Sequence, residues 1–369
     1  MKHVETGVNG LDEVLDGGFF RPSIVLMGGT AGTGKTTMVM QSLFNAAKKE
    51  ETCMYVTALS EPIATINNFM SKFSFYNVSL LGKGNVKYVP LDIEVIHKGS
   101  KAIINEMERN IDIIKPDRIV IDPVNVLTIG LDDEALRQFY YDFFTGMKAW
   151  NSFVLLTGEF TSDSLIRSSL SYLSDGVIYL SNEPYYGRNI RYLNVLKMRG
   201  RNFSGGKFSC KITTDGFTVF PRRTYEIRTS IQKESISTGI KGLDQMTGGG
   251  FKRSSAVLLS GPSGTGKTVV GNQFIVSCLS KNEPGIIVSF EEDAVQIRDN
   301  AMMFGWDLKE FEKKNLLKII NPLEFDASEL ALQIYDEVEK TKAKCMMMDG
   351  INRLHRMMPP HIQFLEYML

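Results

Sequence analysis

The feature that most constrains this chain is a phosphate-binding motif that it contains twice. The two copies are Gly29-Thr30-Ala31-Gly32-Thr33-Gly34-Lys35-Thr36 and Gly261-Pro262-Ser263-Gly264-Thr265-Gly266-Lys267-Thr268. In this pattern, glycines let backbone N–H groups wrap around phosphates, the lysine reaches the outer phosphate oxygens and the threonine hydroxyl faces Mg²⁺. The sequence therefore predicts two P-loops, each of which binds a nucleotide.

Each P-loop has the sequence context that the motif requires. An apolar run precedes it, at residues 23–27 and 256–259, and a helix-like stretch follows it, at residues 38–47 and 269–279. Strand, loop and helix in this order place the positive end of the helix at the phosphates. We expect the next residues, Thr37 and Val269, to contribute to nucleotide binding as well.

The duplication extends well beyond the motif. Residues 6–36 align without a gap on residues 238–268, and 18 of these 31 positions are identical. A length of 369 residues also favours two domains. We predict domain 1 at residues 1–228, domain 2 at residues 229–369, and a polar linker at residues 221–234.

Both domains contain an apolar run that ends in one acid, at residues 118–122 and 344–349. This is the form of a Walker B strand, in which a buried parallel strand delivers a carboxylate beside Mg²⁺. The predicted metal ligands are Thr36, Asp122, Thr268 and Asp349.

The hydrophobic periodicity of domain 1 predicts an α/β fold that ends in a β-meander. Strand candidates at residues 53–57, 86–89, 118–122 and 153–159 are separated by helix candidates that include residues 101–114 and 134–150. The period then changes to two, at residues 177–180, 191–198, 208–212 and 217–220. Only 20 residues follow Asp349, so domain 2 lacks the counterparts of the later strands. Either a shortened protein or a fragment explains this length.

The composition of the chain argues against two classes of function, nucleic-acid binding and membrane insertion. The chain has 42 basic and 42 acidic residues, so its net charge gives no attraction to nucleic acid or to anionic membranes. No apolar run approaches the roughly 20 residues that span a bilayer, and the first residues lack a signal-peptide core. We therefore expect a cytoplasmic protein without membrane contact. Its four cysteines have no metal-binding spacing and are expected to be buried apolar residues.

These motifs together resemble the tandem P-loop ATPases of the RecA superfamily that are similar to KaiC, the clock ATPase. The resemblance covers nearly the whole chain. Its most specific parts are T-G-x-x-G-L-D in both halves, Val288-Ser289-Phe290-Glu291-Glu292, and Leu196-Lys197-Met198-Arg199-Gly200. The resemblance implies two RecA-like P-loop NTPase domains with mostly parallel central sheets, the second incomplete at its C-terminal end. It also implies ATP and Mg²⁺ as cofactors and a hexameric ring.

The resemblance assigns catalytic roles to residues outside the P-loops. Lys197 and Arg199 match cations that touch the γ-phosphate of the neighbouring subunit; the alternative is two solvated residues on one strand face. Glu291 and Glu292 match the paired glutamates that orient the attacking water. Domain 1 has no such pair, and Glu61 is either its substitute or an acid favoured by a helix dipole.

The first functional hypothesis is a slowly hydrolysing ATPase whose ring assembly controls a signalling partner. The second is a DNA-binding recombinase or helicase relative, which the acidic residues 131–134 disfavour because a DNA-facing loop is expected to be basic. The third is an adaptor that binds ATP without hydrolysing it. The segment that corresponds to the phosphorylated residues of KaiC is absent, so neither autokinase activity nor clock function is predicted.

Overall fold

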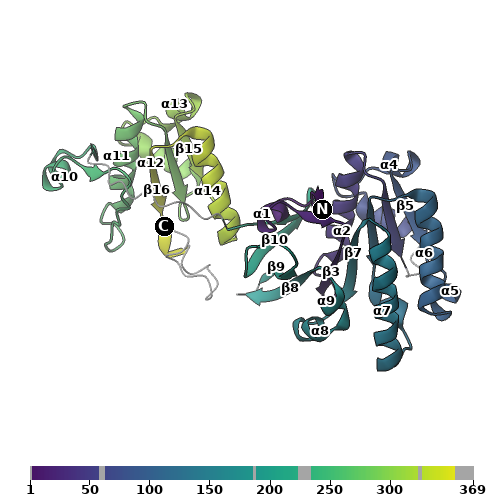
Figure 1. The fold of residues 1–369 in the computed structure, drawn as a ribbon. Coiled ribbons are helices and arrows are strands. Elements are labelled where there is room, and N and C mark those ends of the chain that lie inside the picture. The colour runs from purple at the N-terminus through teal and green to yellow at the C-terminus, as the bar shows by residue number, and fades with distance from the viewer. Residues whose placement is uncertain (1, 58–62, 186–187, 223–233, 323–325, 354–369) are drawn as a thin grey trace. The chain divides into compact units, whose positions relative to one another are not determined.

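The computed structural model describes residues 2–57, 63–185, 188–222, 234–322 and 326–353, and contacts divide the chain into two compact units (Figure 1). Unit 1 is Met1–Arg222 and unit 2 is Arg223–Leu369. Each unit has its own sheet and its own hydrophobic clusters. The predicted boundary at residue 228 and most of the predicted linker fall in residues 223–233, which lie outside the described residues.

Unit 1 follows the predicted alternation of strands and helices. Its first half comprises β1 (Lys2–Val4), α1 (Leu11–Val14), β2 (Phe19–Arg21), β3 (Ser23–Gly29), α2 (Lys35–Lys48), β4 (Cys53–Thr57), α3 (Ile63–Met70), α4 (Val78–Gly82), β5 (Val86–Pro90) and α5 (Ile93–His97). Its second half comprises α6 (Ser100–Ile114), β6 (Arg118–Asp122), the 3-10 helix η1 (Val124–Thr128), α7 (Asp133–Ala149), β7 (Phe153–Glu159), α8 (Ser162–Arg167), α9 (Ser169–Leu173), β8 (Gly176–Tyr185), β9 (Arg188–Met198), β10 (Lys207–Thr213) and β11 (Gly216–Val219).

The main sheet of unit 1 is mixed. Within the described residues it has nine strands in the order β11-β10-β9-β8-β3-β7-β6-β4-β5. The strands from β8 to β5 are parallel, whereas β8, β9, β10 and β11 pair as antiparallel neighbours. This confirms the predicted parallel sheet with a β-meander at its end. The order also places the P-loop strand β3 and the Walker B strand β6 on either side of β7.

The central residues of β3, β4, β6 and β7 are apolar and buried because helices cover both faces of the sheet. Alternate residues of β3 show this directly: Ile24 and Leu26 pack in the cluster with α6, α7 and α9, whereas Val25 and Met27 pack in the cluster with α1 and α2. Figure 1 shows α5, α6 and α7 grouped together in unit 1. The sheet edge that carries the P-loop is therefore held between two packed helical layers.

Unit 2 repeats part of this arrangement. It comprises β12 (Ser235–Ile236), α10 (Lys241–Met246), β13 (Phe251–Lys252), α11 (Lys267–Leu279), β14 (Gly285–Ser289), α12 (Ala294–Met302), α13 (Leu308–Lys313), β15 (Leu317–Ile320), α14 (Ala327–Thr341) and β16 (Cys345–Asp349). Its described parallel sheet has the order β15-β14-β16, which matches β5-β4-β6 of unit 1. One face is covered by α11, α12 and α13, and the other by α14.

The predicted strand before the second P-loop is wrong. Residues 256–259 belong to no strand, and Val257, Leu258 and Leu259 are 49%, 76% and 41% exposed. The reason lies in the pairing of β3, whose partners β7 and β8 both follow the Walker B strand along the chain. The described part of unit 2 has no strand after β16, so residues 256–259 have no strand to pair with there.

The structure also bears on what the sequence predicted about the cysteines and about membrane-spanning segments. Cys53, Cys210, Cys278 and Cys345 are all buried free thiols, as expected for apolar core residues. Among the described residues, no helix combines the length and apolar character needed to cross a membrane.

Candidate nucleotide-binding sites

The first P-loop connects the end of β3 to the start of α2. Gly32 has φ of 76° and Gly34 has φ of 101°, backbone conformations that favour glycine over residues with a Cβ. The helix begins directly after Gly34, at Lys35, so its unpaired N–H groups face the loop. The loop therefore offers the concave arrangement of backbone donors that binds phosphate.

The side chain of Lys35 lies along its own loop. Its ammonium nitrogen donates to the carbonyl oxygens of Gly29 and Thr30, both at 2.8 Å, and the Thr33 hydroxyl donates to the same Thr30 oxygen at 2.8 Å. Burial lowers the pKa of Lys35, while the negative charges of Glu159 and Asp122 act in the opposite direction. The lysine is therefore fixed at the mouth of the loop, where phosphate oxygens would bind.

The second P-loop has the same internal contacts. The Lys267 ammonium donates to the carbonyl oxygens of Gly261 and Pro262 at 2.8 and 2.7 Å, and the Thr265 hydroxyl donates to Pro262 at 2.9 Å. α11 begins at Lys267, as α2 begins at Lys35. The loop thus keeps its shape in unit 2 although the residues before it form no strand.

The Walker B acid of unit 1 is buried among hydroxyl donors. Asp122 is 6% exposed, and its carboxylate accepts hydrogen bonds from the Tyr55 hydroxyl at 3.0 Å and from the Thr157 hydroxyl. Tyr55 lies on β4 and Thr157 on β7, the two strands that flank β6. The neighbouring strands therefore orient the carboxylate toward the sheet edge that carries the P-loop.

In unit 2 the structure brings two predicted metal ligands together. The Thr268 hydroxyl donates to the Asp349 carboxylate at 2.9 Å. A hydroxyl and a carboxylate are oxygen ligands that suit Mg²⁺, which usually completes its shell with waters and substrate phosphates. The donor set at this position therefore fits a magnesium ion.

The predicted glutamate pair of unit 2 follows β14, and its two side chains differ in their surroundings. Glu292 accepts from the Asn300 amide at 3.2 Å with each carboxylate oxygen, which ties it to α12. Glu291 lies beside Gly350, the residue after Asp349: a Cβ on that glycine would be only 2.6 Å from the Glu291 Cγ. Of the two, Glu291 is the one placed next to the Walker B acid.

The corresponding segment of unit 1 includes Leu59, Ser60 and Glu61, which lie outside the described residues. The role predicted for Glu61 therefore stays a prediction.

The two predicted trans cations are held by the C-terminal end of α9. The Lys197 ammonium donates to the carbonyls of Ser171 and Tyr172, both at 2.9 Å. Arg199 donates to the Tyr172 carbonyl at 3.1 Å and pairs with Asp175 at 3.3 Å. Burial and the neighbouring charge of Arg199 lower the pKa of Lys197. Both cations thus have hydrogen-bond partners in their own unit, with Lys197 half-buried and Arg199 exposed.

Arg199 lies toward the end of the sheet opposite to the P-loop of its own unit, whereas Lys197 pairs with Val177, which is level with Leu26 in β3. Asp175, the partner of Arg199, accepts from the backbone N–H of Ile24 at 3.0 Å, near the start of β3. The P-loop begins at Gly29, five residues further along the same strand. Five residues of a β-strand extend about 16 Å. Arg199 is therefore too far away to complete the P-loop of its own unit.

Sequence reasoning missed several residues around the first site. Tyr55 and Thr157 bind the Walker B acid, and Asn125 joins the end of β7 to the chain after β6. Glu159, the last residue of β7, lies level with Gly29 in the sheet. The polar end of the strand at residues 157–159 was a visible signal, but the strand register that brings these groups together is a property of the fold.

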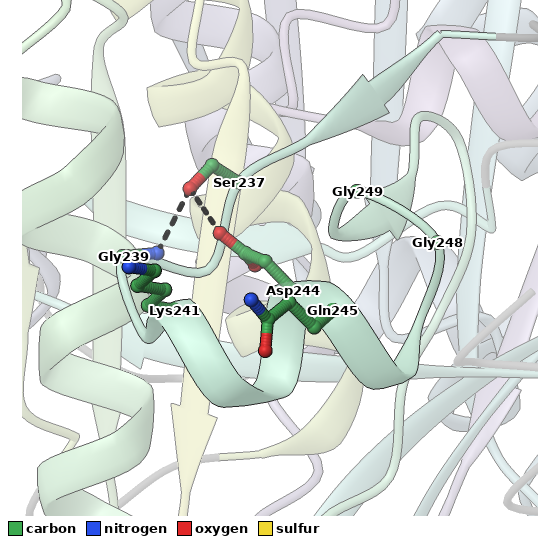
Figure 2. Close-up of a pocket in the computed structure, with 7 residues that line it drawn as sticks. All are labelled: Ser237, Gly239, Lys241, Asp244, Gln245, Gly248 and Gly249. Carbon is green, nitrogen blue, oxygen red and sulfur yellow. Dashed lines mark hydrogen bonds between the residues drawn. The ribbon is translucent and has the colours of Figure 1, made fainter.

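The repeated T-G-x-x-G-L-D pattern stabilises a loop and is separate from the P-loop. In unit 2 the Asp244 carboxylate accepts from the Ser237 hydroxyl at 2.6 Å and from the Thr238 N–H at 2.8 Å, and Figure 2 shows the first contact beside an open recess over α10. Hydrogen bonds from Ser237 and Thr238 hold the pKa of Asp244 below its ordinary value. In unit 1 Asp12 accepts from the Thr6 N–H in the same way. The shared aspartate therefore closes a loop near the start of each unit, ahead of its P-loop.

Comparison with known proteins agrees with this geometry in both units. The family model described as "ATPase: KaiC" matches residues 4–224 and 236–363. The circadian clock oscillator protein KaiC of Parathermosynechococcus lividus is 30% identical over 365 residues, covering 95% of this chain and 67% of the relative. The corresponding proteins of Rippkaea orientalis and Synechococcus elongatus are each 28% identical, covering 96% of this chain and 71% and 70% of the relatives.

Proposed function

This chain belongs to the family of KaiC ATPases, and from that premise we propose that it binds ATP with Mg²⁺ at both P-loops and hydrolyses it slowly. The observation that carries the proposal is the identical placement of the two lysines, each held by the first two carbonyls of its own loop. Because the two loops have the same internal contacts, we expect each of them to bind the same ligand.

The proposed roles follow from the chemistry of each group. Backbone N–H groups of the two loops and the ammonium groups of Lys35 and Lys267 bind the β- and γ-phosphates. The hydroxyl of Thr36 with the carboxylate of Asp122 would hold Mg²⁺ in unit 1, and Thr268 with Asp349 in unit 2. When bound, the ion neutralises charge on the phosphate oxygens. Thr37 and Val269 extend each loop into its helix.

We further propose that unit 1 is completed by a neighbouring subunit in a hexameric ring. Arg199 pairs with Asp175, which lies about 16 Å along the strand from the P-loop of the same unit, and carbonyl groups of α9 hold both Arg199 and Lys197. A cation supplied from outside stabilises the charge that spreads over the γ-phosphate oxygens. The position of the pair supports action on the ATP of another copy of this chain.

In unit 2 we propose that Glu291 orients the attacking water, because it lies beside the residue that follows Asp349. Glu292 supports it from α12 through Asn300. Ring assembly driven by ATP would then control a protein partner, a regulatory role in keeping with relatives that are circadian clock oscillator proteins. The alternative of a DNA-binding recombinase is not favoured, because the KaiC family model matches both units.

The test is the number of ATP molecules bound per chain in isothermal titration calorimetry with Mg²⁺. We expect two sites in the natural sequence, one in Lys35→Ala, one in Lys267→Ala and none in the double variant, because each lysine contacts the phosphates directly. Lys48→Ala, which changes an exposed lysine at the end of α2, is the matched control and should keep two sites. A stoichiometry of one for the natural sequence would contradict the proposal. Absence of ADP formation alongside two bound ATP molecules would favour the adaptor hypothesis.

A further inference from the structure

Glu159 is an acid at the P-loop of unit 1 to which no role has been given. It is the last residue of β7, and it lies level with Gly29, the first residue of the P-loop. β7 separates the P-loop strand β3 from the Walker B strand β6. Glu159 therefore stands at the sheet edge between the two parts of the site that hold phosphate and metal.

The backbone on both sides of Glu159 is fixed to these two parts. The N–H of Phe160 donates to the Gly29 carbonyl at 3.3 Å, the same oxygen that accepts from Lys35. The N–H of Glu159 itself donates to the Asn125 side-chain oxygen at 2.8 Å. Asn125 lies in η1, which follows the Walker B strand directly. The position of Glu159 is thus determined by the P-loop on one side and by the Walker B segment on the other.

The close fit of this segment depends on the glycine before Glu159. A Cβ on Gly158 would lie 2.4 Å from the Phe160 ring and 2.6 Å from the Asn125 oxygen, distances that real Cβ atoms do not adopt. Gly158 lets η1 approach the end of β7 closely enough for the Asn125 hydrogen bond. The sequence Thr157-Gly158-Glu159 therefore holds Asp122, through the threonine, and ends in a carboxylate level with the first residue of the P-loop.

The carboxylate of Glu159 is available to solvent. The residue is exposed, and within the described part of the chain no hydrogen bond or ion pair holds its side chain. Glu159 lies level with Gly29, whose carbonyl oxygen accepts from the Lys35 ammonium. A solvated carboxylate this near the lysine that binds the outer phosphates has room to bind a water molecule next to them.

Unit 1 also differs from unit 2 in a way that leaves the role of such a group open. Unit 2 has Glu291 and Glu292 after β14, but the aligned residues after β4 in unit 1 are Leu59 and Ser60. β4 and β7 flank the Walker B strand on opposite sides. A carboxylate at the end of β7 therefore approaches the same phosphate from the side of β6 opposite to that of the glutamate pair.

We propose that Glu159 is the catalytic carboxylate of unit 1, orienting the attacking water and accepting its proton. This inference rests on the proposed function of ATP hydrolysis. The water oxygen forms a bond to the γ-phosphorus, the bond from that phosphorus to the β,γ-bridging oxygen breaks, and ADP leaves with the bridging oxygen. The proton passes to Glu159 and then to the released phosphate, so ATP and water give ADP and phosphate with nothing left over.

The experiment compares Glu159→Gln with Glu61→Gln and Asp163→Asn, all in the Lys267→Ala background, so that only unit 1 binds ATP. Asp163 is the matched control, since it is an exposed acid four residues further along, on α8. We expect Glu159→Gln to lower kcat by about 100-fold, the usual contribution of a positioned general base. Its Kd for ATP should change by less than about threefold, because glutamine keeps the shape of the side chain. Asp163→Asn should keep most of the parent rate, whereas Glu61→Gln tests the competing assignment of the base to Glu61.

Two results would overturn the inference alone: a Glu159→Gln rate within about twofold of the parent, or a parallel loss of ATP binding. Loss of rate in Glu61→Gln alone would also overturn it and assign the base to Glu61. The proposed function fails in a different way, namely if the Lys267→Ala parent binds no ATP or forms no ADP. The Kd and the rate of the parent therefore separate the two failures.

Discussion

At the scale of single residues, Arg118 shows how a buried charge ties the site to the rest of unit 1. It is 1% exposed at the start of β6, and its guanidinium donates to the Glu5 carbonyl at 2.8 Å and to the Ser42 hydroxyl at 2.6 Å. It also pairs with Glu51 at 3.3 Å. Arg118 thus connects the Walker B strand to the N-terminal segment and to the P-loop helix α2.

We expect Arg118→Ala to destabilise unit 1 by about 3 kcal/mol, because truncation leaves the buried carbonyls of Thr6 and Ser42 without this donor. Arg109→Ala is the control: its guanidinium is exposed on α6 with a nearby Glu106, and such pairs contribute less than about 0.5 kcal/mol. Urea denaturation followed by the fluorescence of Trp150 in a Trp306→Phe background reports unit 1 alone. Equal midpoints for the two variants would contradict this account of Arg118.

At the scale of helices and strands, the sequence predicted those elements whose formation depends on the local pattern of apolar and polar residues. The apolar runs of β3, β6 and β7 and the meander strands were identifiable because their residue types match buried or half-buried strands. The prediction failed at residues 256–259, whose pattern is equally apolar, because a strand exists only when another strand pairs with it. The same limit applies to the first site: the P-loop residues were predicted, but the contacts of Asp122 with Tyr55 and Thr157 depend on long-range register.

The two copies provide a matched test of this difference. Leu26 and Leu258 occupy equivalent positions, but Leu26 is fully buried in β3, whereas Leu258 is 76% exposed. We expect Leu26→Ala to lower the free energy of unfolding of unit 1 by about 2–5 kcal/mol through the cavity that it creates. Leu258→Ala should change that of unit 2 by less than about 0.5 kcal/mol.

The measurement uses Trp150 fluorescence for unit 1 and Trp306 fluorescence for unit 2, each with the other tryptophan replaced by phenylalanine. Similar losses at both positions would mean that residues 256–259 are buried in solution.

At the scale of the whole molecule, the position of Lys197 and Arg199 predicts complementation between chains. In the Lys267→Ala background, Lys35→Ala and Arg199→Ala should each be nearly inactive, since one lacks the P-loop lysine and the other the cation. Random mixing in a ring pairs an intact P-loop with an intact arginine at about one interface in four, so about a quarter of the parent turnover should return.

The prediction is checked by measuring ATP turnover, and molecular mass by light scattering, for each variant alone and for their mixture. Full activity of Arg199→Ala alone, or a monomer in saturating ATP, would show that the site works within one chain.

The second P-loop has a consequence for the ancestry of duplicated proteins. Its lysine and threonine contacts are the same as in the first copy, although the residues before it belong to no strand. The shape that recognises phosphate is therefore inherited within roughly eight residues, through glycine conformations and contacts inside the loop. Duplication of a short segment is therefore enough to copy a loop that is able to bind phosphate.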